Sequence, residues 1–562
     1  MSGYVLVTTP TEHVPRLRGL FRDEETTVLP LPQGRSLVYV SNSATVTSTA
    51  IFQGYSIDHE AETMAFVGAD EEHLPHPSRP LEGSYFTARL DDCGVECGAD
   101  LFGFVAMAWF SDPLVSAISD SYLSLIAIRR ALGLPCRPHE ETIRGRMWLN
   151  SMGLQQLGRE TYGAGVRFAT PGTRLRFEHE SGMLSETPLD LVDRYTGVFD
   201  THAEAVTVSA QRMVRTIMTY AAAGGLVSLG LSGGTDSRLC LAATLAADIG
   251  DQLHIASTKN ASADYAVASE LGSTFGFEVN APSRHIQGRL RQNDLAQGWA
   301  ASSLGLYDAL YMPRAFRERD VPVFTVGGQG AEVSKGNYGW RPLARITMPP
   351  DALRQARSGL AAIGVSAGDR WESEWHYLGF RNPLHSGRAN LSSDYVARPA
   401  AQVPLVGLSR SDVNELPAPG HGAPNVILDA IIKINPKLAL HPFDSASKNV
   451  SSQFVAERLD SVGGPLEIGR LSPYMIAGSP QPAHGVTGSQ LDIARGRGFT
   501  GDLTPRSLLP LAGAMIEQFA ELVPADVRQR LDELDPASTV RLPAAAREAG
   551  AIGTLLALTT VA

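Results

Sequence analysis

Short runs of β-branched and aromatic residues, interrupted by Gly, Asp and Pro, dominate the first 200 positions of the chain. The pattern predicts strands, because such residues fit a pleated, half-buried surface. One helix is expected over DSYLSLIAIRRALGLP (120–135), which offers an N-cap at Asp120 or Ser121 and a Gly-x-Pro stop. Residues 1–200 therefore predict a β-sheet layer domain with few helices. The clearest strand runs are GYVLVTT (3–9), SLVYVSNSATVTSTAIF (36–52), GSYFTARL (83–90) and GFVAMAWF (103–110).

From Thr201 onward the pattern changes to alternating helices and strands. THAE (201–204) is a T-x-x-E capping box, and an apolar helix face follows it. LVSLGL (226–231) predicts a short buried strand, and SRLCLAATLAAD (237–248) predicts a helix that is apolar nearly all round. This alternation predicts a parallel sheet that binds ligands at the carboxyl ends of its strands. The later elements are strands over QLHIAST (252–258) and VPVFTVGGQG (321–330) and a helix over ADYAVASELGSTFG (263–276).

The loop LSGGTDSR (231–238) joins the first of these strands to its helix. Two glycines let the backbone approach a ligand closely, and the helix N-terminus adds positive partial charge, so the loop predicts an anion site, most simply for phosphate. It is neither a Walker A loop nor a dinucleotide-binding fingerprint. Asp236 would repel a polyphosphate unless a divalent cation lay between them, which implies Mg²⁺. The alternative is a plain strand-to-helix turn with a capping Asp.

SGGTDS (232–237) resembles the pyrophosphate loop S-G-G-x-D-S of the ATP pyrophosphatases, and two further segments narrow the resemblance to the asparagine synthetase family. GGQGAEVSKGNY (327–338) resembles that family's S-G-[DE]-G-x-D-E-x-x-x-G-Y segment. ASTKNASADYAVASELGSTFG (256–276) resembles its shared strand and D-x-x-x-A helix. Members of the family adenylate a carboxylate with ATP, release pyrophosphate and form an amide when an amine attacks. The resemblance implies ATP and Mg²⁺ as cofactors.

The resemblance also implies roles for individual positions. Glu332 falls where the family has its second metal carboxylate, so Asp236 and Glu332 are the expected metal ligands. Ser257 and Gly328 match positions where the family's backbone contacts adenine and ribose. Metal and backbone donors here would offset the charge that develops on the leaving pyrophosphate. The loop residues expected to hold the pyrophosphate and its Mg²⁺ are Leu231, Ser232, Gly233, Gly234, Thr235, Asp236 and Ser237.

Three positions depart from the family pattern. Gln329 stands where asparagine synthetases have Asp or Glu and β-lactam synthetase-like members have Tyr, and an amide cannot act as a general base. Glu332 is one methylene longer than the usual Asp. Arg238 stands where Ser is usual, and it either steadies a phosphate or pairs with a neighbour on its helix.

The first 200 residues resemble the family's glutaminase domain, an N-terminal-nucleophile (Ntn) αββα sandwich, in the pattern of its late strands. Ser2 occupies the slot of the nucleophilic Cys, and the R-G-P-D and N-G-x-x-Y-N segments are missing. A serine without an adjacent base is a far weaker nucleophile than a thiolate. We therefore expect a domain that does not release ammonia from glutamine, with a serine nucleophile as the alternative.

A degenerate glutaminase domain before a retained synthetase domain is the pattern of β-lactam synthetases, carbapenam synthetases and lasso-peptide cyclases. The expected architecture is an Ntn-like sandwich over 1–200 and a pyrophosphate-loop parallel α/β domain with a helical carboxyl-terminal part over 201–562. The expected function is AMP-forming ligation of a small-molecule or peptide carboxylate to an amine other than ammonia, joining two molecules or cyclising one, in natural-product biosynthesis. The alternatives are an asparagine synthetase that uses ammonia or glutamine, and a non-catalytic nucleotide-binding scaffold.

The carboxyl-terminal half supplies further candidates. ARGRGFTGDL (494–503) resembles a late basic segment where the family has a Lys near the pyrophosphate, so Arg495 and Arg497 are candidates, with an exposed basic turn as the alternative. Glu372 and Glu374 are candidates for the acid–base role that Gln329 cannot fill, with solvated helix-face acids as the alternative. The remaining candidates are Lys433, Lys437 and Lys448 as pyrophosphate ligands, and His421 and His441, for which a structural role is expected.

Composition narrows the class of protein. The 562-residue chain has a formal net charge of −11, which argues against nucleic acid as the main partner, because phosphate binding needs a basic surface. Its 4 cysteines are too few for a disulfide scaffold, and Cys93 and Cys97 have no matching His or Cys pair nearby for zinc. No apolar run reaches the ~18 residues of a membrane span, and the start lacks the pattern of a signal peptide. We expect a cytoplasmic protein without a membrane partner, and homo-oligomerisation stays open.

Overall fold

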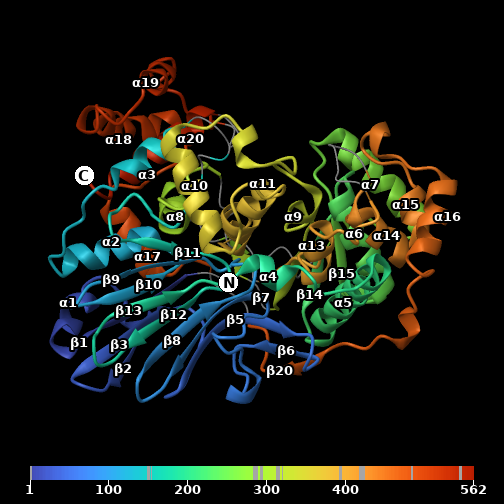
Figure 1. Cartoon of the computed structure of the whole chain (residues 1–562), viewed down its shortest axis with the longest axis horizontal. Helices are drawn as coiled ribbons and strands as arrows, with labels where there is room; N and C mark the ends of the chain where they lie inside the picture. Colours follow the sequence, from blue (N-terminus) through green and yellow to red (C-terminus); the bar gives the residue numbers. More distant parts are fainter. Residues whose placement is uncertain are drawn as a thin grey trace.

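Two antiparallel sheets form the amino-terminal part of the protein (Figure 1). The computed structural model describes residues 3–148, 152, 155–282, 289–290, 295–311, 317–318, 321–391, 395–416, 424–481, 485–542 and 547–562. The first sheet has the strand order β11-β9-β10-β1-β3-β2. Its strands are β1 (Tyr4–Pro10), β2 (Thr26–Leu31), β3 (Arg35–Ser41), β9 (Met107–Ser111), β10 (Ser116–Ser119) and β11 (Arg167–Ala169).

The second sheet has the order β13-β12-β8-β7-β5-β6-β20, with β4 paired to β5. It packs face to face on the first sheet, and the aromatic rings of Tyr4 and Phe86 stack between them with centroids 4.1 Å apart. Its strands are β4 (Thr45–Val46), β5 (Ala50–Asp58), β6 (Thr63–Phe66), β7 (Glu82–Leu90), β8 (Gly94–Ala99), β12 (Arg174–Glu178), β13 (Leu184–Thr187) and β20 (Met475–Ala477).

Strand β1 explains why the predicted strands read as nearly continuous apolar runs. Tyr4 and Leu6 point into the core between the two sheets, whereas Val5 and Val7 face helices α1 (Val14–Arg18) and α2 (Tyr122–Ala131). Alternate side chains of a strand lie on opposite faces, so a strand buried on both faces needs apolar residues throughout. Helix α2 starts as expected, because the Ser121 hydroxyl accepts a hydrogen bond from the N–H of Ser124.

A four-stranded parallel sheet forms the second part, in the order β15-β14-β18-β19 (Figure 1, right). The chain passes from β14 through helix α6 to β15 on one side, and later adds β18 on the other side of β14. The loops after β14 and β18 therefore lie side by side at the carboxyl edge, at the switch in strand order where open α/β sheets bind ligands. The strands are β14 (Leu226–Gly230), β15 (Leu253–Ala256), β18 (Val323–Val326) and β19 (Tyr395–Ala397).

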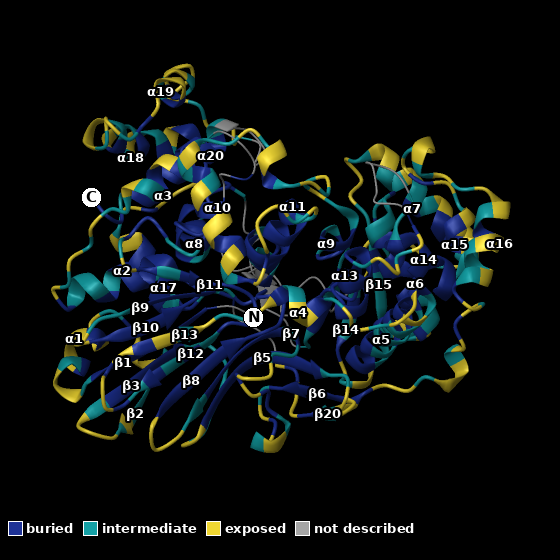
Figure 2. Cartoon of the chain, in the orientation of Figure 1, coloured by how far each residue is buried: buried dark blue, intermediate teal, exposed yellow. Residues whose placement is uncertain are grey.

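Three helices account for the burial of this sheet. The core around it joins side chains of α5 (His202–Ala222), α6 (Thr235–Ala247) and α14 (Val426–Ile434). Thr201 caps α5 by accepting a hydrogen bond from the N–H of Glu204, as the sequence predicted. The all-round apolar pattern of α6 is explained by this position, since it packs against both α5 and α14. Figure 2 shows the strands in buried colours and the outer helices, such as α16, with exposed faces.

Helices of the later chain complete the fold. Those of the parallel part are α7 (Ser262–Phe275), α9 (Glu332–Lys335), α13 (Val403–Ser409), α15 (Pro436–Leu440) and α16 (Ser452–Ser461). Those over the antiparallel part are α3 (Glu140–Arg146), α4 (Leu191–Tyr195), α8 (Leu295–Ser303), α10 (Pro350–Ala362), α11 (Glu372–His376), α12 (Asn382–Gly387), α17 (Gly488–Gly496), α18 (Pro505–Gln518), α19 (Ala525–Asp532) and α20 (Arg547–Leu558). A short antiparallel ladder pairs β16 (Arg289–Leu290) with β17 (Arg317–Glu318), on either side of α8 in sequence.

The chain returns to its beginning after residue 470. Strand β20 adds to the edge of the second sheet beside β6, and α17 then packs on α2 and α8. The predicted boundary at residue 200 therefore separates the two kinds of sheet, but the amino-terminal sandwich includes a strand from the carboxyl-terminal half. The fold is mixed α/β with several sheets, one of them parallel. Of the part of the chain that the structure describes, no helix has the length and apolarity to cross a membrane.

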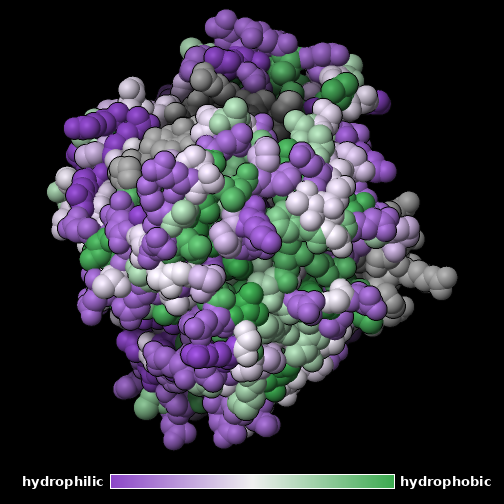
Figure 3. Space-filling view, turned by 90° about the vertical axis from the view of Figure 1, so that its right-hand side faces the viewer, coloured by the Kyte–Doolittle hydropathy of each residue, from purple (hydrophilic) through white to green (hydrophobic). Residues whose placement is uncertain are grey.

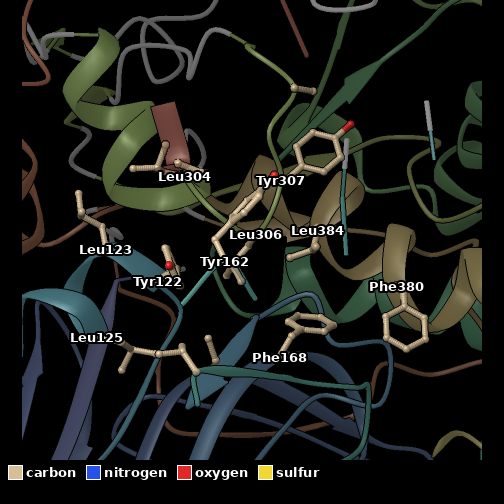
Figure 4. Packing of buried hydrophobic residues seen from close by; sticks show 14 of the residues in the cluster. Tyr122, Leu123, Leu125, Tyr162, Phe168, Leu304, Leu306, Tyr307, Phe380 and Leu384 are labelled. Carbon is tan, nitrogen blue, oxygen red and sulfur yellow. The ribbon is translucent and has the colours of Figure 1, made fainter. Parts of the chain in front are cut away.

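A buried ion pair ties α3 to the carboxyl terminus. The guanidinium of Arg146 lies 2.7 Å from Oδ2 of Asp308, with both side chains fully buried. The same carboxylate accepts hydrogen bonds from the hydroxyls of Tyr162 and of Thr554 on α20. Tyr162 also belongs to the large apolar core, part of which Figure 4 shows. The network joins segments that lie far apart in sequence.

Replacing Asp308 by Ala should therefore be strongly destabilising. It would leave the Arg146 guanidinium buried without its carboxylate, which costs about 3–5 kcal/mol in the free energy of unfolding. Glu140→Ala is the matched control, because Glu140 forms an exposed ion pair with Arg144 on the same helix and should cost ~0.5 kcal/mol at most. Urea unfolding followed by circular dichroism measures both values. Equal small effects would show that the ion pair carries no stability.

Candidate functional site

The two Gly-rich loops meet at the carboxyl edge of the parallel sheet. Strands β14 and β18 pair in register from Leu226 with Val323, so their loops begin side by side. A Cβ atom added to Gly328 would lie 2.4 Å from Cβ of Asp236. Only glycine fits at this contact, and the second loop therefore packs directly on the first turn of α6.

The first loop is held in shape by its own hydroxyl groups. The N–H of Leu231 donates to the carbonyl of Ala256 (2.8 Å), which continues the pairing with β15. The Ser237 hydroxyl accepts from the N–H of Ser232 (3.1 Å) and lies 2.9 Å from the Ser232 hydroxyl. Helix α6 then begins at Thr235 behind Gly234 without a side-chain cap. The first N–H groups of a helix have no partner within it, so this end can bind an anion.

Two acidic residues fix Gly233, and the sequence analysis did not identify either role. Oδ1 of Asp264, in the first turn of α7, accepts a hydrogen bond from the N–H of Gly233 (2.8 Å). The N–H of Asp444 donates to the Gly233 carbonyl (3.1 Å). Asp264 is the Asp of the D-x-x-x-A segment, so its position in that motif was the available signal. Asp444 could not be found in this way, because its contact is made through the backbone.

Asp236 and Glu332 are neighbouring carboxylates from the two loops. Glu332 opens the short helix α9, and its Oε2 accepts a hydrogen bond from the N–H of Gly330 (2.8 Å). Burial and the neighbouring Asp236 carboxylate raise the pKa of Glu332. Nζ of Lys335 lies 2.5 Å from Oδ2 of Asp236 and partly offsets the charge of this pair. Lys335 lies within the GGQGAEVSKGNY segment but was not selected from the sequence.

The pair of carboxylates fits a magnesium site of the kind completed by substrate. Among the described residues, no cluster of three or more His, Cys, Asp or Glu side chains has the arrangement of a metal site. Mg²⁺ keeps several waters and is commonly held by one or two carboxylates together with phosphate oxygens. Asp236 and Glu332 supply that number of protein ligands beside an anion-binding helix end.

Arg238 does not point to the loop. Its guanidinium donates to the carbonyls of Leu438 (3.3 Å), His441 and Pro442 (2.7 Å), and it stacks 3.7 Å from the ring centroid of Phe443. Of the two interpretations that the sequence left open, neither describes this contact. Arg238 fixes the segment that carries Asp444 against Gly233, so its role is structural.

Ser257 and Gln329 line the edge of the site. The side-chain amide of Asn280 accepts from the N–H of Ser257 and donates to its carbonyl, both at 3.0 Å. The backbone of Ser257 is thus occupied, whereas its hydroxyl is buried without a hydrogen-bond partner among the described residues. Gln329 lies half-buried between Gly328 and Gly330.

The structure does not bring Arg495 and Arg497 to the loop. Both lie at the end of α17, which packs on α2 and α8 in the antiparallel part. The Arg495 side chain is 63% exposed and pairs with Asp492 (3.4 Å). The expectation that these arginines bind the pyrophosphate is therefore wrong for this conformation, because α17 follows β20 back to the amino-terminal sheets (Figure 1).

Glu372 and Glu374 hold loops in place and are not solvated acids. Glu372 accepts from the N–H groups of Leu343 (2.7 Å) and Gly368 (2.8 Å). Glu374 accepts from the N–H of Tyr338 (2.6 Å), and burial raises its pKa. Glu374 therefore positions the segment that follows Lys335. Glu372 is not free to act as the expected acid or base, since its two oxygens are already engaged.

The other candidates are placed as follows. Nζ of Lys433 donates to the Val462 carbonyl (2.8 Å), and Lys448 pairs with Asp444 (2.7 Å) beside the loop. Lys437 is exposed on α15, and His441 has its ring 3.7 Å from Glu270. Ser2 and His421 lie outside the described residues.

The amino-terminal end of the described chain is enclosed. The N–H of Gly3 donates to Oδ2 of Asp120 (2.5 Å), and the side chain of Gln490 donates to the same carboxylate (2.9 Å). A Cβ atom on Gly3 would lie 2.7 Å from the Gly485 carbonyl oxygen. The segment before α17 thus covers Gly3 and leaves no room beside it.

A small open pocket of about 40 Å³ lies between the antiparallel part and helix α12. Phe104, Leu306 and Leu384 give it apolar walls, and Arg388 supplies a cation. The Arg388 guanidinium lies over the rings of Tyr307 and Tyr311. The Phe104 ring, which lines this pocket, would lie 3.7 Å from a Cβ on Gly330 of the second loop. Figure 3 shows the face of the molecule that lies on the right in Figure 1. On this face, hydrophilic residues surround a more hydrophobic centre.

Comparison with known proteins adds no assignment: the chain matches no protein-family profile, and no curated protein matches it.

Gly233→Ala tests how tightly the loop is built. The added Cβ would lie 2.5 Å from Cβ of Asp444, a close contact within packed backbone, and should cost about 1–3 kcal/mol in the free energy of unfolding. The control is Gly230→Ala at the end of β14, whose added Cβ meets nothing within 4 Å and should stay within ~0.5 kcal/mol of wild type. Urea denaturation of both variants makes the comparison. Similar values for the two would mean that the loop shifts freely.

A pH dependence follows from His376 on α11. Burial lowers its pKa to about 4, and its Nε2 lies 2.9 Å from the Leu157 carbonyl. The neutral ring therefore stabilises the fold above its unfolded pKa of 6.5, and this contribution is lost as the pH falls toward 4. In the wild type, the unfolding free energy should fall by up to about 3 kcal/mol between pH 6.5 and pH 4 because of this ring. His376→Gln should not show that part of the fall. His76→Gln, at an exposed ring, should keep the wild-type profile, and a wild-type profile for His376→Gln would contradict the prediction.

Proposed function

We propose that this protein is an AMP-forming ligase that adenylates a carboxylate with ATP and joins it to an amine other than ammonia. The observation that carries the proposal is the meeting of the two Gly-rich loops, with Asp236 and Glu332 converging beside the uncapped N-terminus of α6. The proposal includes the finer architecture expected from the sequence: an Ntn-like amino-terminal sandwich and a pyrophosphate-loop domain of the asparagine synthetase kind.

The loop chemistry suits release of pyrophosphate. The first N–H groups of α6 and the Ser232 and Ser237 hydroxyls would bind the leaving phosphates, where negative charge develops in the transition state. Asp236 and Glu332 would hold Mg²⁺, which when bound supplies Lewis-acid neutralisation of the phosphate oxygens. Asp264 and Asp444 keep Gly233 fixed, so the donors are oriented before the nucleotide arrives.

The small pocket at helix α12 would bind one end of the acyl substrate. Arg388, whose guanidinium lies over the rings of Tyr307 and Tyr311, would bind an anionic group there, next to apolar walls. These features favour a carboxylate with an apolar portion, as expected for natural-product or peptide substrates.

Ser2, in the slot of the nucleophilic Cys, supports an amine that is not made on site. A serine without an adjacent base is a far weaker nucleophile than a thiolate. An asparagine synthetase supplied by glutamine is correspondingly disfavoured. A non-catalytic nucleotide-binding scaffold is the second candidate, favoured by Gln329, which offers no base between the loops.

Asp236→Ala tests the proposal. The wild-type protein, given ATP, Mg²⁺ and a pool of carboxylates and amines, should release pyrophosphate and AMP, and the variant should lose at least ~100-fold of this rate because a metal ligand is removed. Asp251→Ala, an exposed acid before β15, is the control. Stimulation by ammonia or glutamine alone would favour an asparagine synthetase. Nucleotide binding without turnover would favour the scaffold.

A further inference from the structure

Helix α9 presents two opposite charges to Asp236. Glu332 and Lys335 are three residues apart, so they lie on one face of its single turn. Nζ of Lys335 lies 2.5 Å from Oδ2 of Asp236, and both side chains are partly exposed, at 29% and 22%. The ammonium group thus stands at the carboxylate pair that fits a divalent cation.

An ammonium group at this carboxylate competes with a metal ion for the same negative charge. Mg²⁺ binds carboxylate oxygens at about 2.0–2.1 Å, so a metal ion on Asp236 would lie within a few ångströms of Nζ. Two cations at such a separation repel each other. Lys335 therefore opposes binding of a metal ion at Asp236, and movement of its ammonium group away would favour it.

The surroundings fix the backbone of Lys335, whose side chain is partly exposed and has its ammonium group at Asp236. Its carbonyl accepts a hydrogen bond from the indole N–H of Trp340 (3.3 Å). Gly336 ends the helix with a φ of 84°, and a Cβ there would lie 1.8 Å from the Trp340 nitrogen. A lysine is a point charge on a flexible four-carbon stem, so it can change partners while its backbone stays in place.

We propose that Lys335 is an exchangeable counter-ion for the metal position. It holds Asp236 when no metal is bound, and it moves to the polyphosphate when the metal–nucleotide complex takes its place. The proposal rests on the proposed function for the identity of the nucleotide, but the exchange at Asp236 is a property of the ligand-free protein. The Lys335 ammonium thus changes partner from Asp236 to the polyphosphate, where it supplies positive charge to the leaving group.

Lys448 provides a matched control. It also forms a lysine–carboxylate pair next to the loop, with Nζ 2.7 Å from Oδ1 of Asp444. Asp444 contacts Gly233 through its backbone N–H and shares no site with Glu332. Removal of the Lys448 charge should leave the metal affinity at Asp236 unchanged. Removal of the Lys335 charge should raise this affinity, because the competing cation is gone.

The experiment measures Mn²⁺ binding to the full-length protein without nucleotide, by electron paramagnetic resonance. Lys335→Met should bind Mn²⁺ roughly three- to tenfold more tightly than wild type, because a competing cation is gone. Lys448→Met should match wild type, and Asp236→Asn should lose the tight site. The same Lys335→Met variant should bind ATP with Mg²⁺ several-fold more weakly, since a phosphate contact is lost.

Lys335→Gln, which keeps the stem and a polar end, is measured in parallel in case Lys335→Met does not fold. Unchanged or weaker Mn²⁺ affinity in the folded variants would overturn the proposal and leave a purely structural ion pair. Retention of the tight site in Asp236→Asn would overturn it as well. A gain in Mn²⁺ affinity without any pyrophosphate release by the wild type would support the exchange and refute the ligase activity, so the two failures are distinguishable.

Discussion

The pairing of β14 with β18 is the interaction on which the site depends. These strands are adjacent although the helices and strands of nearly 100 residues separate them in sequence, and their loops emerge at the same edge. Gly328 then lies against Asp236 with no room for a side chain. A change in this register would move Asp236 away from Glu332, and the proposed metal position with its lysine counter-ion would be lost.

The supports around the first loop come from three different segments. Asp264 on α7 and the backbone of Asp444 both bind Gly233, and Arg238 anchors the segment that carries Asp444. An arginine that donates to three carbonyl groups and stacks on an aromatic ring is held rigidly. The loop is therefore preorganised by contacts that no ligand has to supply, which is the condition under which backbone donors bind phosphate well.

The amino-terminal sandwich and the parallel sheet are linked physically as well as covalently. Strand β20 returns from the carboxyl-terminal half to the sandwich, and the segment that leads into α17 then packs on Gly3, while Gln490 of α17 donates to Asp120. Phe104, from the sandwich, approaches Gly330 in the second loop. The sandwich thus contributes to the surroundings of the second loop.

Local pattern was enough to predict many elements of this protein. Runs of β-branched and aromatic residues predicted β1 and β7, the T-x-x-E box predicted the start of α5, and the Gly-rich segments predicted the two loops, because these features depend on neighbours in sequence. Tertiary structure decided the rest. The packing of distant segments decides three contacts: Lys335 pairs with Asp236, Arg238 donates to the Pro442 carbonyl, and Arg495 lies on the sandwich side. Charge and spacing along a chain do not encode which carbonyl or carboxylate a long side chain will reach.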